Sequence, residues 1–403
     1  MSERTKFIRR LLDGEKMTDL CREFGISRKT GHKIWNRFRA RGFEGLGDRS
    51  RQPLFSPQRT PRDIVARVLE LRRRYPTWGP KKLRERFQQV NPGVRPPAAS
   101  TIGVIIDDAG LVDGRRRHRR NVASPTPLRQ TTAPNQLWCV DFKGQFRLGD
   151  RRYCYPLTLS DHCSRYLLLC EALENTRAEG ARAALEEGFR EYGVPDAVRS
   201  DNGAPFASTG RLGLTQLSVW LLRLGIELER IEPGHPEQNG RHERMHLTLK
   251  QETTRPAAAN LLQQQERFDE FRECFNMERP HEALAMKTPA SAYTPSPRTY
   301  DPDRIIEPLA YPLHDHTARV FADGSAFIRP LDRRVHIGTA FAGENVGLRE
   351  LASGTWLVSF LDYELGYLDE GARLLPNSAA DELDETMKTK METTDSPLPM
   401  SPV

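Results

Sequence analysis

Two aspartates stand where carboxylates could hold metal ions for phosphate chemistry. Asp141 lies inside the apolar run 137–142, and Asp201 precedes Asn202 after a shorter apolar run. A lone charge in an apolar strand is costly unless it is paired or bound to a metal. Carboxylate oxygens suit Mg²⁺ or Mn²⁺, and two such ions can activate an attacking hydroxyl and stabilise the leaving oxygen of a phosphodiester. A third acid on a nearby helix would complete the cluster.

Glu237 and Glu243 compete for this third place. Both lie in the segment 234–244, which is rich in Gly, Pro and Asn and turns from a loop into a helix. Met245 and Leu249 are four residues apart, which predicts the buried stripe of that helix. Glu243 then projects away from the core side, at roughly 100° per residue. Glu237 lies in the loop before the helix begins.

The elements around these acids predict a mixed sheet covered by helices. Apolar and β-branched runs predict strands at 137–142, 153–159, 166–170, 197–198 and 226–228. Apolar stripes predict helices at 181–192 and 214–224. The first three strands follow one another directly, so we expect them to pair in antiparallel fashion. Asp201 lies at a strand end, where the sites of α/β sheets are usually built.

Residues 1–50 have the pattern of a helix-turn-helix domain. An apolar face around Leu20 is broken by Gly25, and Ser27 is a good N-cap for a following helix. The outer side of that second helix carries three candidate DNA contacts, namely Arg28, Lys29 and Lys33. The second helix of such a motif enters the major groove. The alternative is a helical bundle with a solvated basic face.

Residues 60–113 repeat the pattern of helix, turn and basic helix. They predict a second unit of the helix-turn-helix kind, with an ordinary helical bundle as the alternative. Residues 114–134 form a basic linker, in which Arg116 and Arg117 are candidate phosphate contacts. A simple solvated linker would have the same composition.

The C-terminal part changes character again. Residues 315–375 are β-rich, with a hairpin signal at Asp323-Gly324, and predict a small β-barrel. Residues 376–403 are polar, acidic and rich in Pro, Ser and Thr, which predicts a disordered tail.

Charge is distributed unevenly along the chain. Residues 1–130 carry 31 Lys and Arg against 13 Asp and Glu, whereas the other residues carry 30 against 41. A basic front half favours a polyanion partner, most simply nucleic acid. The six cysteines include no C-x-x-C pair, which argues against a zinc module or a disulfide framework. Because no signal peptide or long apolar run stands out, we expect a cytoplasmic, nucleoid-associated protein with no membrane partner.

Three runs in order carry a family resemblance. They are residues 135–142 (NQLWCVDF), 200–206 (SDNGAPF) and 236–244 (PEQNGRHER). Together they look like the DDE catalytic core of retroviral-type integrases, and more closely the chain resembles bacterial insertion-sequence transposases of that superfamily. The segment 275–289 also resembles the end of that core. The resemblance implies a multidomain chain, with all-α helix-turn-helix units in front of an α/β, RNase H-like integrase core at 135–295.

The resemblance also implies an activity and a set of ligands. Asp141, Asp201 and Glu243 would be the catalytic residues and would hold two Mg²⁺ or Mn²⁺ ions. The reaction would be metal-dependent cleavage of transposon-end DNA and strand transfer into target DNA. The partners would be those two DNAs and further copies of the chain, as a homodimer or higher homo-oligomer.

Further candidate DNA contacts lie near these acids in the sequence. They are Asn202, next to Asp201, and Arg241, His246 and Lys250, in the helix that carries Glu243. His246 and Lys250 lie three and seven positions after Glu243, so we expect them to share its face. Ordinary surface polarity is the alternative.

The spacing of the third acid departs from the family pattern. Counted from Asp201, Glu237 fits the pattern better, with 35 intervening residues against 41 for Glu243. The sequence context favours Glu243, because the family's acid follows the glycine inside the helix. A longer loop at 208–215 would accommodate the extra residues.

Two other functions fit parts of this sequence. A catalytically inactive, sequence-specific DNA-binding protein, such as a domesticated repressor, could retain the fold, although it would not need the three acids. A nuclease acting on RNA–DNA hybrids could share the core, although it would not need two helix-turn-helix units.

Overall fold

The computed structural model describes residues 2–48, 59–112, 128–208, 213–232, 235–351, 354–368 and 374–375. Arg116, Arg117, most of the predicted linker and the predicted tail at 376–403 lie outside these residues. Residues 1–61 form one compact unit, and residues 62–403 form another.

The first unit folds as predicted for a helix-turn-helix domain. Its described part contains α1 (Glu3–Leu12), α2 (Met17–Glu23), α3 (Arg28–Arg41) and the 3-10 turn η1 (Gly42–Leu46). The hydroxyl of Ser27 accepts a hydrogen bond from the amide of Thr30, which confirms the predicted N-cap of α3. Apolar side chains from all three helices form its core, whereas Arg28, Lys29 and Lys33 are exposed along α3.

Residues 62–112 form a second helical domain. Its helices are α4 (Arg62–Arg74), α5 (Pro80–Val90) and α6 (Ala99–Asp108). The rings of Tyr75 and Trp78 stack 4.1 Å apart between α4 and α5, and Phe87 and Ile102 pack in the same core. Pro80 begins α5, where its missing N–H costs nothing.

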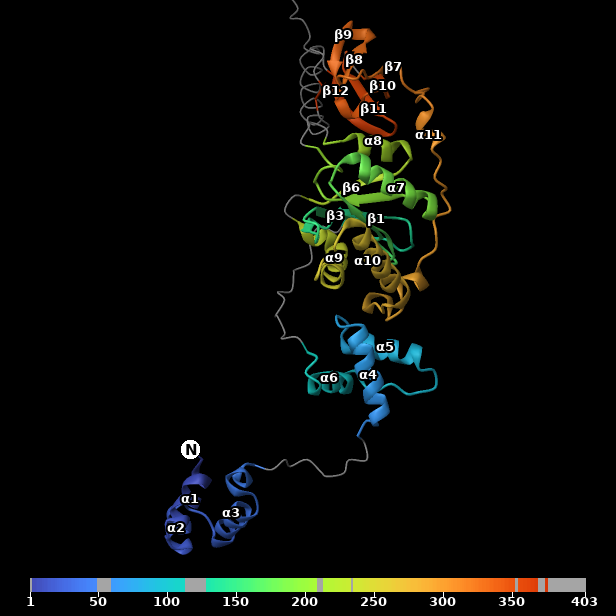
Figure 1. Cartoon of the computed structure of the whole chain (residues 1–403). Helices are drawn as coiled ribbons and strands as arrows, with labels where there is room; N and C mark the ends of the chain where they lie inside the picture. Colours follow the sequence, from blue (N-terminus) through green and yellow to red (C-terminus); the bar gives the residue numbers. More distant parts are fainter. Residues whose placement is uncertain are drawn as a thin grey trace, which may run out of the picture. The chain divides into compact units, whose positions relative to one another are not determined.

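Six of the described strands form one mixed sheet (Figure 1). They are β1 (Trp138–Phe142), β2 (Phe146–Arg147), β3 (Tyr153–Asp161), β4 (Leu167–Leu173), β5 (Ala197–Ser200) and β6 (Glu227–Arg230). β3 pairs in antiparallel fashion with β1, β2 and β4, whereas β1 with β5 and β5 with β6 pair in parallel. The predicted antiparallel start and mixed sheet are both confirmed.

Helices cover both faces of this sheet (Figure 1). α7 (Ala178–Tyr192) and α8 (Gln216–Arg223) pack with Trp138 and Val140 on one face. The other face meets α9 (Gly240–Thr253) and α10 (Leu261–Glu273), and the short turn η2 (Pro236–Asn239) leads into α9. Because side chains alternate along a strand, Asp141 lies on the face opposite Val140, which is the α9 face.

Short turns follow α10 and lead to the C-terminal region. They are the π-helical turn η3 (Cys274–Glu278), the 3-10 turns η4 (Glu282–Leu284) and η5 (Pro289–Ala292), and α11 (Asp303–Ile306). The described strands beyond them are β7 (His316–Arg319), β8 (Ser325–Ile328), β9 (Arg333–His336), β10 (Asn345–Glu350), β11 (Trp356–Phe360), β12 (Tyr363–Leu368) and β13 (Leu374–Leu375), with the 3-10 turns η6 (Arg329–Leu331) and η7 (Thr339–Phe341) between them.

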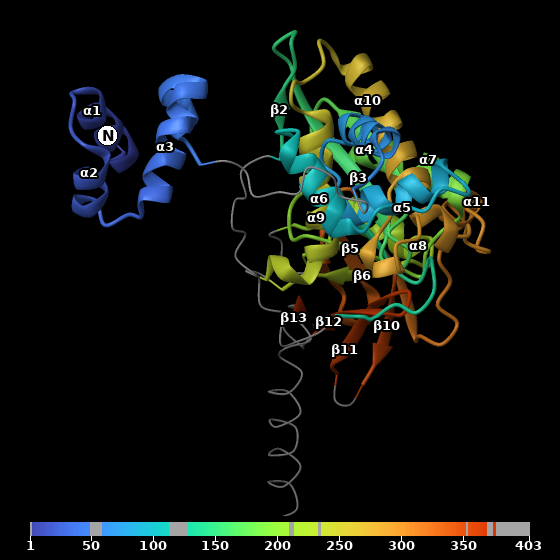
Figure 2. The same cartoon turned by 90° about the horizontal axis from the view of Figure 1, so that it is seen from below.

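The predicted small barrel is not confirmed. Five of the described strands form an antiparallel sheet in the order β13-β12-β11-β10-β7, and β8 and β9 form a separate hairpin. β10, β11 and β12 lie side by side in both views of the chain (Figure 1 and Figure 2). Leu214 and Val219 of the integrase-like core share the apolar cluster of this sheet, so the two regions pack together. In the part of the chain that the structure describes, no helix has the length and apolar character needed to cross a membrane.

Candidate active site

The three predicted acids come from three elements that meet at one end of the sheet. Asp141 is the fourth residue of β1, and Asp201 directly follows β5. In the parallel pairing of these strands Trp138 lies opposite Val198 and Cys139 opposite Arg199, so the same register carries Asp201 alongside Asp141. Glu243 lies exposed in the first turn of α9, which covers this face.

The carboxylates interact with one another electrostatically. Burial and the negative charges of Asp201 and Glu243 together raise the pKa of Asp141 to about 7, against the opposing effect of Lys143. A carboxyl group with such a pKa lies among like charges and has lost much of its hydration. This set of three hard oxygen donors therefore fits a divalent cation, which would neutralise the crowded charge.

The turn after β5 fixes the second aspartate. The amide of Gly203 donates to Oδ1 of Asp201 at 3.0 Å, and the side chain of Asn202 donates to the carbonyl of Ile231 at 2.7 Å. A Cβ at position 203 would lie 3.1 Å from Oδ2 of Asp201, so glycine leaves room for the carboxylate. Asn202 thus ties the turn to the segment before α9.

Two histidines of α9 lie buried under the acids. His242 and His246 both place Nε2 within hydrogen-bonding distance of the Thr158 hydroxyl, at 2.8 and 2.7 Å. Nδ1 of His242 lies 2.8 Å from the Ser160 hydroxyl, and Nδ1 of His246 lies 3.6 Å from Oδ2 of Asp141. Burial lowers the pKa of His242 to about 3 and that of His246 well below its usual value, so both rings are neutral.

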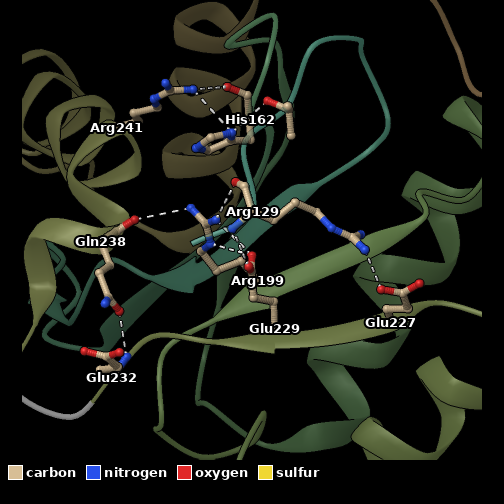
Figure 3. A network of polar contacts seen from close by, with 9 residues as sticks. Arg129, His162, Arg199, Glu227, Glu229, Glu232, Gln238 and Arg241 are labelled. Atoms are coloured by element: carbon tan, nitrogen blue, oxygen red, sulfur yellow. Dashed lines mark hydrogen bonds and ion pairs between the residues drawn. The ribbon is translucent and has the colours of Figure 1, made fainter. Parts of the chain in front are cut away.

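A buried arginine anchors the segment that leads into α9 (Figure 3). Arg199 of β5 donates Nε to Glu229 at 2.9 Å, Nη1 to the carbonyl of Gln238 at 3.2 Å and Nη2 to the carbonyl of Arg129 at 3.2 Å. The side chain of Gln238 in turn accepts from the amide of Glu232 at 2.7 Å. Arg199 thus joins two parallel strands to the residues just before Gly240, where α9 begins.

A cavity of about 340 Å³ lies beside the start of α9 and is strongly basic. Its charged lining consists of Lys82, Arg165, Arg241, Arg244 and Arg279, with the acids Asp161 and Glu282. Burial, together with neighbouring cations, lowers the pKa of Lys82 to about 8 and that of Arg165 to about 10. Asp161 is already held by Ser164 and the amide of Asn135, so it offers little compensation. The cavity therefore suits an anion.

Of the predicted DNA contacts near the acids, Asn202, Arg241 and Lys250 are exposed, whereas His246 is buried. Arg241 and Lys250 are exposed on α9, and one guanidinium nitrogen of Arg241 donates to the carbonyl of His162 at 3.2 Å (Figure 3). His246 was expected on the same exposed face and is instead 3% exposed. That expectation is wrong, because position 246 falls on the α9 stripe that packs against β3. His246 is a core residue beside Asp141 and cannot contact phosphate from the surface.

Sequence reasoning missed His242, Arg199, Thr158 and Ser160, and it assigned His246 to the surface. His242 and His246 are four apart on a helix, which is a readable signal for one shared face. Arg199 stands in a short strand two residues before Asp201, where a charged side chain is unusual. Thr158 and Ser160 carried no signal, because hydroxyl residues are common in strands and only the tertiary contacts show their role.

The two competing glutamates differ in their backbone setting. Glu237 lies in η2, before Asn239 caps the start of α9, and its side chain lies outside the described set. Glu243 lies within α9 as predicted, and its charge affects Asp141. The choice of Glu243 stays a prediction, as does the loop explanation, because residues 209–212 lie outside the described ranges.

Family models match the two kinds of domain seen in the fold. Integrase core domain models match residues 131–236 and 224–289. A helix-turn-helix domain model matches residues 3–53, and a homeodomain-like domain model matches residues 30–106. The chain therefore carries helix-turn-helix DNA-binding domains in front of an integrase core domain.

Similar proteins include products of bacterial insertion elements. An uncharacterized 39.2 kDa protein of insertion element IS476 from Xanthomonas euvesicatoria is 26% identical over 286 residues, which cover 69% of this chain and 78% of that protein. An uncharacterized 31.7 kDa protein of insertion element IS407 from Burkholderia multivorans is 28% identical over 185 residues, which cover 45% of this chain and 64% of that protein. Among solved structures, the catalytic core domain of HTLV-2 integrase in complex with magnesium is 14% identical, with a TM-score of 0.33, over 41% of this chain and 100% of that chain.

Proposed function

From an integrase core domain that follows helix-turn-helix domains, we propose that this chain is a DDE-type DNA transposase. It first hydrolyses a phosphodiester at the transposon end, with water as the nucleophile, and then joins the freed 3′-hydroxyl to target DNA by transesterification, which releases a 3′-hydroxyl of the target strand. The observation that supports the proposal most is the perturbed carboxyl group of Asp141, whose pKa is raised to about 7 by burial and by the charges of Asp201 and Glu243. A buried acid whose pKa is raised by neighbouring acids is typical of a metal-dependent active site.

The three carboxylates would hold two Mg²⁺ or Mn²⁺ ions. When bound, the ions would activate the attacking oxygen and stabilise the leaving oxygen of the phosphodiester. Asp141 and Asp201 are fixed by β1 and by the hydrogen-bonded turn after β5. Glu243 would reach the same site from α9, whose start is held by Arg199.

The basic surfaces would hold and orient the two DNA partners. Arg28, Lys29 and Lys33 on the exposed side of α3 would meet a DNA groove, as in other helix-turn-helix domains. Asn202, Arg241 and Lys250 lie exposed around the acids, and the basic cavity beside α9 would take a phosphate of the bound strand. Because two transposon ends must be joined to one target, the working form would be a homodimer or a higher homo-oligomer on DNA.

A strand-transfer assay with matched variants tests this function. The full chain with Mg²⁺ should nick and join DNA that carries the ends of its own element. Asp201→Asn should lower that activity by at least about 10³-fold and leave DNA binding unchanged, because a metal ligand is lost without loss of basic charge. Asp269→Asn, an exposed position on α10, is the control. Equal activity of the Asp201→Asn and Asp269→Asn proteins would overturn the mechanism. If the wild-type chain binds the ends of its element specifically but does not cleave them with any divalent metal, the function is that of a DNA-binding protein without catalysis.

The same assay decides between the two glutamates. Glu243→Gln should abolish strand transfer, whereas Glu237→Gln should retain it, because Glu243 lies inside α9 and its charge raises the pKa of Asp141, whereas Glu237 precedes that helix. Loss of activity only in the Glu237→Gln protein would show that the acid lies before the helix.

A further inference from the structure

The imidazole of His246 faces the carboxylate of Asp141 inside the core. Its Nδ1 lies 3.6 Å from Oδ2 of Asp141, and the side chain is almost wholly buried. Ligand atoms of Asp141, His242 and His246 all lie within 4.8 Å of one another, on the α9 face of the sheet. The protonation of these rings decides what lies between the nitrogen and the carboxylate.

The hydroxyl of Thr158 restricts that protonation. It carries one hydrogen and lies 3.1 Å from the carbonyl of Asp141, 2.8 Å from Nε2 of His242 and 2.7 Å from Nε2 of His246. Because one hydrogen serves only one of these three acceptors, at least one of the two Nε2 atoms donates to the hydroxyl. When Thr158 donates to the carbonyl of Asp141, both Nε2 atoms donate to Thr158, and each neutral imidazole then has a lone pair on Nδ1.

The two Nδ1 lone pairs have different surroundings. Nδ1 of His242 lies 2.8 Å from the hydroxyl of Ser160, which can donate to it, so both nitrogens of His242 are used. Nδ1 of His246 has the Asp141 carboxylate as its polar neighbour, at a distance too long for a direct hydrogen bond. Two electron-pair donors thus face each other across a gap that a cation would fill.

We propose that Nδ1 of His246 is a nitrogen ligand to a divalent transition-metal ion held by Asp141. The inference rests on the proposed function in one respect, namely that Asp141 binds metal. His246 then adds a nitrogen ligand to the oxygen ligand from Asp141. His242 contacts the hydroxyls of Thr158 and Ser160 and is not a ligand. The hydrogen bond from Nε2 to Thr158 has the form that orients metal-binding histidines in proteins, in which the second ring nitrogen donates to a neighbouring acceptor.

The spacing of the two donor atoms favours one class of ion. Two ligands about 2.1 Å from a shared ion and 3.6 Å apart enclose an angle of roughly 120°. Mg²⁺ demands angles near 90° and oxygen donors, whereas Zn²⁺ and other ions that accept imidazole tolerate wider angles and lower coordination. The site should therefore bind Mn²⁺ or Zn²⁺ more tightly than Mg²⁺.

Pulsed electron paramagnetic resonance on the full chain loaded with MnCl₂ tests the nitrogen ligand directly. The unlabelled protein should show ¹⁴N modulation from a directly bound imidazole, and protein grown with ¹⁵N-histidine should show the corresponding ¹⁵N frequencies instead. This measurement needs no substitution, so it does not depend on the folding of a variant. Bound Mn²⁺ without histidine nitrogen coupling would overturn the proposal.

His246→Gln identifies the residue, because glutamine can place an amide N–H where Nε2 donates to Thr158 but has no atom equivalent to Nδ1. This variant should lose the nitrogen modulation and bind Mn²⁺ roughly tenfold or more weakly in calorimetry. His281→Gln, at a half-buried histidine in the basic cavity, is the control and should keep both signals. Unchanged modulation in a folded His246→Gln protein would refute the assignment.

The outcomes separate this inference from the proposed function. Nitrogen coupling in a protein that never joins DNA would support the ligand and contradict the transposase. Strand transfer with Mn²⁺ bound only through oxygen would support the transposase and contradict the ligand.

Discussion

Asp141 is the residue on which the candidate site depends most. It sits in an apolar strand, it is mostly buried, and two further acids act on it. These conditions destabilise its charged form and leave the fold under electrostatic stress whenever the carboxyl group is ionised without a cation. Its titration therefore links metal binding to the stability of the free protein.

Asp141→Asn should stabilise the metal-free protein at pH 8 and have little effect near pH 4. The pKa of Asp141 is raised by burial to about 7 in the folded chain, from an unfolded value of 3.8. A raised pKa contributes stability that is fully present below the unfolded pKa and is lost as the pH rises through the folded pKa. Asparagine stays neutral, so the variant should be more stable by about 1–3 kcal/mol at pH 8.

Urea unfolding of both proteins in the presence of a chelator, at several pH values, measures this difference. Adding Mn²⁺ at pH 8 should reverse the order, because only the wild type gains binding energy. A difference in stability that is the same at pH 4 and pH 8 would show that ionised Asp141 is not under stress.

At the scale of elements, the start of α9 must be held beside the sheet for Glu243 to act. Arg199 holds it through three hydrogen bonds to groups on β6, on the segment before α9 and on the segment before β1 (Figure 3). Arg199 is 2% exposed, so these bonds are formed away from bulk water. Its planar fork of donors suits three separate acceptors, which a lysine ammonium cannot reach together.

Arg199→Lys should loosen the start of α9 while leaving the sheet intact. We expect a loss of about 1–3 kcal/mol of stability, since hydrogen bonds to a charged group are lost. Hydrogen exchange should become faster for amides at 235–241 and change little in β1 and β3. Arg129→Lys is the control, because Arg129 pairs with Glu227 at the surface and such pairs contribute at most about 1 kcal/mol. Equal hydrogen exchange at 235–241 in both variants would show that Arg199 does not position the start of α9.

At the scale of the whole molecule, the helical domain of residues 62–112 contacts the integrase core through a compact polar joint. Arg86 of α5 pairs with Glu278 of the core at 2.7 Å, and within the core Arg279 pairs with Glu252 at 2.8 Å. Thr77 also donates to Glu252, which lies on α9. The helix that carries Glu243 is thus joined to a neighbouring helical domain.

A double-mutant cycle should detect this joint. Arg86→Met and Glu278→Gln should show a coupling of about 1–2 kcal/mol in unfolding free energy, because both side chains are largely buried in the contact. Lys81 and Glu282 join the same two regions at 3.4 Å but are exposed, so their cycle should give less than about 1 kcal/mol. Similar couplings for both pairs would show that burial does not strengthen the Arg86 contact.

The sequence by itself determined the order of elements and the secondary structure around each of the three acids. Period-two and helical spacings depend on local patterns, so the mixed sheet, the capped helix after Ser27, the strand around Asp141 and the turn after Asp201 could all be predicted. The helical position of Glu243 also follows from the stripe of Met245 and Leu249.

Only the tertiary structure decided what surrounds those acids. His246 was expected on the surface because sequence spacing gives its angle on α9 but not the position of the sheet beneath it. The hydrogen bonds of Thr158 and the three partners of Arg199 join residues up to 88 positions apart, which no local pattern encodes. The division of the C-terminal strands into a five-stranded sheet and a separate hairpin could not be predicted either, because strand order depends on long-range pairing. The sequence identified groups able to bind metal, and the folded chain decided which of their lone pairs face one another.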